Sequence, residues 1–271
     1  MLLETRHLAK NFGGVHAVED LALRLEPGQV FGLIGPNGAG KTTLINLISG
    51  HLRADGGSIL FDGTDVTYLP PHELTARGIA RTFQGVRLFK GLTVLDNLLV
   101  GRHTRVRSDV FRRLVPRVPH PRGAGAQGQG PLRAKRTRDE PVRDDPLVRT
   151  LLERIGLAQR ADALAGELAY GDQRRLEIAR ALASEPRLLL LDEPAAGMNP
   201  TESDRLRELM RALVAEGITI ILIEHDVRLV MGTCERVAVL NFGRKIAEGT
   251  PAEIQADPAV REAYLGAEDA A

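Results

Sequence analysis

Two short stretches of the sequence carry residue types suited to phosphate chemistry. The first runs from Gly35 to Thr43, Gly-Pro-Asn-Gly-Ala-Gly-Lys-Thr-Thr, and matches the pattern G-x-x-x-x-G-K-[ST]. Glycines let backbone N–H groups turn inward around phosphate oxygens, Lys41 adds positive charge at the β and γ oxygens, and Thr42 can offer its hydroxyl to Mg²⁺. We therefore predict a nucleotide phosphate loop made of Gly35, Asn37, Gly38, Ala39, Gly40, Lys41, Thr42 and Thr43.

The second stretch places two acids, Asp192 and Glu193, directly after the four leucines of residues 188–191. An aspartate at the end of a buried strand can hold Mg²⁺ through its water shell, and the next residue can orient and deprotonate an attacking water. We assign the metal role to Asp192 and the general base to Glu193. The alternative, an acidic pair at the surface end of a helix, is disfavoured by the leucines before it.

The surrounding pattern alternates strand-like and helix-like segments, as an α/β fold requires. A strand at 29–34 runs into the phosphate loop and then an apolar helix, and residues 188–191 read as a strand covered on both faces. Asn199, Pro200 and Glu202 form a helix start with a capping box. The helix that follows carries one apolar stripe until Gly217, and 218–223 supplies the next strand.

Further motifs make the chain resemble the ATP-binding subunit of ABC transporters over its whole length apart from a basic insertion. Residues 168–180, Leu-Ala-Tyr-Gly-Asp-Gln-Arg-Arg-Leu-Glu-Ile-Ala-Arg, are similar to the family's signature motif. Arg81-Thr-Phe-Gln84 resembles its Q-loop, and Ile223-Glu-His-Asp226 its switch region. The resemblance implies an α/β fold with a P-loop NTPase (RecA-like) core at 1–84 and 184–271, an antiparallel β edge, and an α-helical subdomain inserted at 85–183.

The resemblance also implies roles for single residues. Gln84 is expected to touch Mg²⁺ and relay toward a membrane partner, and His225 to contact the γ-phosphate. Phe12 is expected to stack on adenine, and Asn199 to lie in the loop between two protomers. The signature residues are expected to meet the ATP of the other protomer; they are Tyr170, Gly171 and Gln173. Residue 169 is alanine where the family commonly has serine, so one hydroxyl contact to the γ-phosphate is missing.

Finer resemblance, in residues 81–89, 168–175 and 262–266, indicates the branch that imports branched-chain amino acids. It implies a homologous ATPase subunit as a hetero- or homodimer partner, two integral membrane permease subunits and, indirectly, an external solute-binding protein. Uptake of urea or short amides, and lipopolysaccharide export, remain alternative transport roles. A soluble non-transport ABC ATPase and an NTP-dependent kinase remain as functions of another class.

Composition limits which of these functions the chain can have. The 271 residues are 43% hydrophobic and have no stretch near the ~20 apolar residues of a spanning helix, and the start does not resemble a signal peptide. We expect a peripheral protein at the cytoplasmic face of the cell membrane. Cys234 is the single cysteine, and we give it no function. The formal net charge of +1 argues against nucleic acid as a partner.

Charge is nevertheless concentrated at residues 101–143, which hold twelve basic and three acidic residues. The centre of this segment is rich in Pro, Gly and polar residues without apolar periodicity, so it cannot bury enough surface to order itself. We interpret about 105–143 as a basic mobile insertion. It is either a solvated loop or a contact with anionic lipid headgroups.

Overall fold

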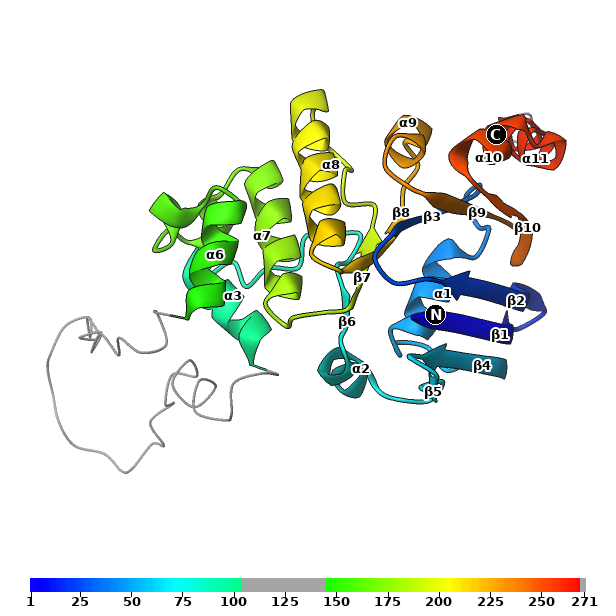
Figure 1. The fold of residues 1–271 in the computed structure, drawn as a ribbon, viewed down its shortest axis with the longest axis horizontal. Coiled ribbons are helices and arrows are strands. Elements are labelled where there is room, and N and C mark those ends of the chain that lie inside the picture. Colours follow the sequence, from blue (N-terminus) through cyan, green and yellow to red (C-terminus); the bar gives the residue numbers. More distant parts are fainter. Residues whose placement is uncertain (104–144, 269–271) are drawn as a thin grey trace, which may run out of the picture.

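The computed structural model describes residues 1–103 and 145–268, and the predicted insertion at about 105–143 lies outside the described residues. The elements alternate as the sequence predicts (Figure 1). In chain order they are β1 (Leu3–Phe12), β2 (Val15–Leu25), β3 (Val30–Ile34), α1 (Lys41–Ile48), β4 (Gly56–Phe61), β5 (Thr64–Asp65), α2 (Pro71–Arg77), β6 (Ile79–Arg81), α3 (Val94–Arg102), α6 (Pro146–Arg154), α7 (Tyr170–Leu182), β7 (Leu188–Asp192), α8 (Pro200–Ala215), β8 (Thr219–Ile223), α9 (Val227–Met231), β9 (Arg236–Asn241), β10 (Arg244–Gly249), α10 (Pro251–Ala256) and α11 (Pro258–Glu268).

The main sheet of the described part has the order β10-β9-β3-β8-β7-β6. All its pairings are parallel except that of the edge strand β10 with β9. The three strands that the sequence predicts are the neighbours β3, β8 and β7. Their carboxyl ends meet at one edge of the sheet, which is where ligands bind in open α/β sheets.

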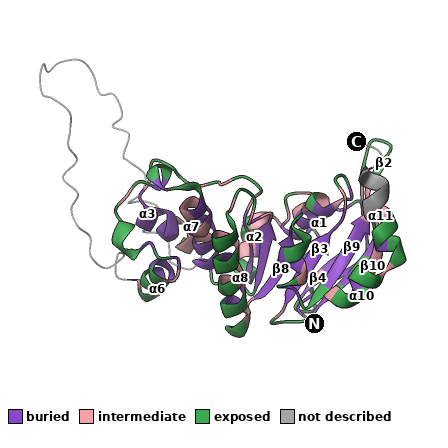
Figure 2. Ribbon diagram, turned by 90° about the horizontal axis from the view of Figure 1, so that it is seen from above, coloured by how far each residue is buried: buried purple, intermediate pink, exposed green. Residues whose placement is uncertain are grey.

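The central strands are buried on both faces, because two separate hydrophobic clusters cover the sheet. In β3, Val30 and Ile34 pack into one cluster, while Phe31 and Leu33 pack into the other. The strands β7 and β8 alternate in the same way. Figure 2 shows the strands as buried ribbons between helices with exposed outer faces. This explains why the leucine run before Asp192 lacks an apolar–polar alternation.

A second sheet is antiparallel, with the order β2-β1-β4-β5 in the described residues. Leu3 and Leu21 from this sheet share a hydrophobic cluster with Leu44 of α1 and Phe31 of β3. Helix α1 therefore lies between the two sheets and is packed from both sides. The P-loop NTPase fold with an antiparallel β part is confirmed.

Helices α3, α6 and α7 gather at the end of the molecule away from the antiparallel sheet (Figures 1 and 2). They come between β6 and β7 in the chain, although these two strands are neighbours in the sheet. This arrangement is compatible with a helical insertion, and its division from the core at residues 85 and 183 stays a prediction. No helix of the described residues is long and apolar enough to cross a membrane.

Helix α8 begins as the sequence predicts. The Asn199 side chain accepts the Glu202 N–H, and the Glu202 carboxylate accepts the Asn199 N–H, which completes a capping box with Pro200 at the first position. Gly217 follows the helix with φ of 89°, a left-handed conformation that glycine adopts without strain. The helix start matters for the site because it fixes the loop that follows Glu193.

Candidate nucleotide site

The phosphate loop joins β3 to α1, and two of its glycines are required by geometry. Gly35 has φ of 150°, and a Cβ there would lie 2.2 Å from the Leu240 carbonyl oxygen. Gly40 has φ of 99°, and a Cβ there would lie 2.3 Å from the Ala17 carbonyl oxygen. The loop is thus held against backbone on two sides. Helix α1 begins at Lys41, so the N–H groups of its first turn have no preceding turn to bond and face the loop opening.

Lys41 is buried beneath this loop, with 6% of its surface exposed. Its Nζ donates to the carbonyl oxygens of Gly35 at 2.7 Å and Pro36 at 2.9 Å. Burial lowers the pKa of the Lys41 ammonium, and the carboxylates of Glu193 and Asp192 oppose that shift. An incoming phosphate would supply a closer counter-charge, so the amine is placed to favour an anionic ligand.

Asp192 ends β7 and forms a buried ion pair with Arg81, whose Nη2 lies 3.0 Å from the Asp192 Oδ2. The Nη1 of Arg81 donates to Asn46 Oδ1 of α1 at 2.5 Å and to Oγ of Ser49, the residue that caps α1, at 3.1 Å. Arg81 therefore ties the acid to the helix that follows the phosphate loop. In the sequence, Arg81 stands out only as part of the Q-loop resemblance. Its pairing with Asp192 could be found only once the structure showed that β6 and β7 are neighbouring strands.

The three predicted catalytic residues come together at the carboxyl ends of β6, β7 and β8. Gln84 Nε2 donates to Glu193 Oε2 at 3.0 Å, and His225 Nε2 lies 2.8 Å from Glu193 Oε1. The backbone of Glu193 has φ of 49°, which is uncommon for a residue with a side chain. Both carboxylate oxygens are thus held by side chains from neighbouring loops, so the carboxylate has a fixed direction.

The donor set of this site fits Mg²⁺. Asp192 Oδ1 is buried and has no hydrogen-bond partner within the described residues, so one carboxylate oxygen remains for a ligand. Thr42 is exposed in the first turn of α1 and offers a hydroxyl. Mg²⁺ prefers such oxygens and is commonly held by one or two protein groups together with substrate phosphates.

A cavity of about 510 Å³ opens above the phosphate loop. It is lined by Val15, His16, Ala17, Asn37, Gly38, Ala39, Gly40, Lys41, Thr42, Thr43, Gln84, Glu193, His225 and Phe242. Thus most of the predicted phosphate and catalytic residues share one space. Asp192 lies behind them, buried at the end of β7.

The aromatic residue that lines the cavity is not the one that the sequence analysis assigned to it. Phe12 ends β1, is 47% exposed and has Lys10 Nζ 5.4 Å from its ring centroid, but it is not among the lining residues. Its role in stacking stays a prediction. Phe242, in the turn between β9 and β10, does line the cavity and is 82% exposed. The only sequence feature that marks Phe242 is its position before Gly243, which indicates a turn but does not predict a role in nucleotide binding.

The predicted signature residues lie elsewhere, at the start of α7, and none of them lines the phosphate cavity. Tyr170 is exposed. Gln173 Nε2 donates to the Leu168 carbonyl at 2.8 Å. A Cβ at Gly171 would lie 2.3 Å from Glu202 Oε1, so this glycine makes room for the capping carboxylate of α8.

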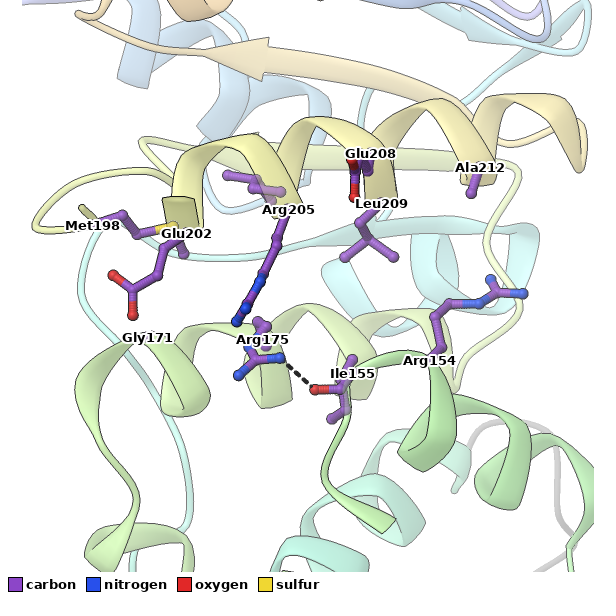
Figure 3. A pocket seen from close by; sticks show the side chains of 11 residues that line it. Arg154, Ile155, Gly171, Arg175, Met198, Glu202, Arg205, Glu208, Leu209 and Ala212 are labelled. Atoms are coloured by element: carbon purple, nitrogen blue, oxygen red, sulfur yellow. Dashed lines mark hydrogen bonds between the residues drawn. The ribbon is translucent and has the colours of Figure 1, made fainter. Parts of the chain in front are cut away.

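A second cavity, of about 290 Å³, separates α7 from α8 next to Gly171. Figure 3 shows the Glu202 side chain directed from α8 toward Gly171, and Arg175 reaching the Ile155 carbonyl, 2.7 Å away. The signature helix is therefore held by contacts with α8 and with the end of α6.

Comparison with known proteins agrees with this geometry. The family model described as ABC transporter matches residues 18–196, and a model described as branched-chain amino acid ATP-binding cassette transporter matches residues 244–270. The chain belongs to the ABC transporter family of ATP-binding cassettes. It is an ATPase by that membership, and its relatives are described as ATP-binding proteins.

Particular relatives cover nearly the whole chain. The high-affinity branched-chain amino acid transport ATP-binding protein LivG of Escherichia coli K12 is 44% identical over 266 residues, 98% of both chains. BraF of Pseudomonas aeruginosa, which carries the same description, is 42% identical over the same share. The lipopolysaccharide export ATP-binding protein LptB of Escherichia coli K12 is 34% identical over 97% of both. A solved ABC transporter cassette in its ADP conformation has a TM-score of 0.79 at 33% identity, covering 98% of both chains.

Proposed function

We propose that this chain hydrolyses ATP to drive the uptake of branched-chain amino acids through separate membrane subunits. The observation that carries the cargo assignment is the identity to LivG along 98% of both chains, together with the match of the C-terminal residues 244–270 to the branched-chain model. The lower identity to the lipopolysaccharide export protein disfavours that alternative.

The chemistry assigned to the site is an in-line attack of water on the γ-phosphorus. The phosphates lie on the loop N–H groups and on Lys41. Glu193 orients the water and takes its proton, while the bond from the γ-phosphorus to the bridging oxygen breaks and the electron pair stays with ADP. Gln84 and His225 hold the Glu193 carboxylate through hydrogen bonds of 3.0 and 2.8 Å. When bound, Mg²⁺ would neutralise phosphate charge, and Thr42, Asp192 and Gln84 are the residues assigned to hold it.

The assembly assigned to this function adds four subunits to this chain. A homologous ATPase subunit pairs with this chain, and two integral membrane permease subunits dock against the pair. An external solute-binding protein delivers the amino acid, so it acts on this chain only indirectly. The chain itself is placed at the cytoplasmic face of the membrane, as a peripheral subunit.

The test is uptake of radiolabelled leucine in source cells that lack the gene. Cells complemented with the intact chain are expected to regain uptake, and cells with Glu193→Gln are not. Glu216→Gln serves as the matched control, because Glu216 pairs with Arg154 at the surface, away from the cavity. If leucine uptake does not depend on the gene, the assignment of branched-chain amino acids as cargo is contradicted. Urea, short amides and exported lipids would then be assayed in the same strains.

A further inference from the structure

Arg174, in the second turn of α7, is fully buried although its guanidinium is charged. Nε and the two terminal nitrogens donate to five backbone carbonyls at 2.6–3.3 Å. These carbonyls fall in two groups, one just before and in the Q-loop and one at the end of β7: Phe83 and Gln84, and Asp192, Glu193 and Pro194.

The charge of Arg174 is balanced inside the same helix. Glu177 Oε2 lies 2.7 Å from Arg174 Nη1, and both side chains are nearly inaccessible. The other oxygen of Glu177 accepts the Arg87 N–H at 3.1 Å. Arg174 thus has six acceptors for five N–H groups, so all five are used and one N–H of Nη2 is shared between two carbonyls. An ammonium, with three N–H groups, cannot serve this set.

Two of these carbonyls belong to residues whose side chains meet in the phosphate cavity. Arg174 Nη2 lies 3.2 Å from the Gln84 carbonyl and 2.7 Å from the Glu193 carbonyl, while Gln84 Nε2 lies 3.0 Å from Glu193 Oε2. The backbone of Glu193 has φ of 49°, a conformation that persists only where its surroundings hold it. One guanidinium therefore fixes the main chain on both sides of this side-chain contact.

We propose that Arg174 is a positioning residue for ATP hydrolysis: from the signature helix it holds the backbones of Gln84 and Glu193 so that the Glu193 carboxylate faces the γ-phosphate. The inference rests on the proposed role of Glu193 as base. Because Arg174 is part of α7, a change in the angle of α7 relative to the sheet moves its donors away from these carbonyls. The helix that begins at Tyr170 and the catalytic base are thereby coupled within one chain.

The experiment compares four variants of the full chain by kcat and by the dissociation constant for ATP. Arg174→Met removes all the donors, and Arg174→Lys keeps the charge beside Glu177 with fewer donors. The double change R174M/E177M replaces the buried pair with apolar side chains, which buried pairs commonly tolerate in folding. Arg187→Met is the matched control, because Arg187 lies outside α7 and pairs with Asp62 where both side chains are more than half exposed.

We expect the double variant to bind ATP as the unchanged chain does and to lose about 10²-fold in kcat, as a base displaced by about 1 Å would. Arg174→Lys should fall between this and the unchanged chain, and Arg187→Met should keep its kcat. A double variant that melts as usual and keeps full kcat would overturn the inference. If it does not fold, full kcat in a folded Arg174→Lys would do so.

Glu193→Gln, assayed in parallel, separates this inference from the proposed function. If Glu193→Gln is inactive while the Arg174 double variant is fully active, only the positioning role of Arg174 is contradicted. An active Glu193→Gln removes the assignment of Glu193 as the base, whatever the Arg174 variants do.

Discussion

The phosphate cavity and the start of the signature helix differ in how many of their side chains are already held in place by contacts within this chain. In the cavity, Lys41 is buried under the loop and Glu193 is held by two side chains. At the start of α7, Tyr170 is exposed, and none of the signature residues lines the cavity. The chain therefore preorganises the groups assigned to act on its own nucleotide, while Tyr170 at the start of the signature helix is left exposed. Changes in the two regions should differ in what they affect.

The largest effect is expected in the preorganised region. Glu193→Gln keeps the size of the side chain but removes the carboxylate proposed as the base, so hydrolysis should fall by roughly 10²–10⁴-fold. ATP affinity should stay close to that of the unchanged chain, because the loop and Lys41 are untouched. Single-turnover hydrolysis and equilibrium ATP binding measure the two quantities. Equal losses in both would mean that Glu193 acts mainly in binding.

Arg81→Leu tests whether the cavity depends on buried charge. It leaves Asp192 buried without its partner, and breaking such a pair typically costs about 3–5 kcal/mol. Arg187→Leu is the surface control, because Arg187 pairs with Asp62 where both side chains are more than half exposed, a kind of pair usually worth about 0–1 kcal/mol. Urea unfolding measures both. Equal destabilisation would show that the cavity gains nothing from burying this pair.

Tyr170→Asp tests the open region. It adds negative charge at a surface assigned to an anionic ligand, at a side chain that is 46% exposed and whose ring lies beside Gly197. ATP affinity of the isolated chain should not change, while hydrolysis by the assembled transporter should fall about 10²-fold, the low end of the loss expected when one stabilising contact to developing charge is removed. Loss of ATP affinity in the isolated chain would erase the distinction between the two regions.

The smallest effect concerns the packing of Cys234 beside Gly32 of β3. Burial raises the pKa of Cys234 to about 12 from an ordinary value of 9.0. The folded chain therefore binds the thiol proton more tightly than the unfolded chain, so stability from this group falls as the pH rises from about 9 toward 12. At pH 8, labelling of the thiol should be far slower in the native chain than in urea. Equal rates would show that this part of the core opens readily.

Local pattern was enough to predict the phosphate loop, the strand before it, the capping box at Asn199 and the buried strand ending in Asp192. These features depend on residues that are close in the sequence, and glycine, proline and capping residues have strong local preferences. The contact between Gln84, Glu193 and His225 could be expected only from the family resemblance.

Contacts set by the arrangement of strands and helices could not be predicted. Arg81 meets Asp192 because β6 and β7 are neighbours in the sheet, although 111 residues separate them in the chain. Arg174 reaches two loops because α7 packs under both, and an arginine in an amphipathic helix gives no sign of being buried. Phe242 lines the cavity because the turn between β9 and β10 lies beside it.

The position of Phe242 bears on nucleotide choice. A phenylalanine ring has no hydrogen-bond donor or acceptor, and every nucleobase has a face on which such a ring can stack. An exposed ring at the mouth of the cavity therefore favours a flat base without distinguishing adenine from guanine. If stacking on this ring is the main contact of the base, GTP should enter the cavity nearly as well as ATP, and the supply of nucleotide in the cell would decide which one is consumed.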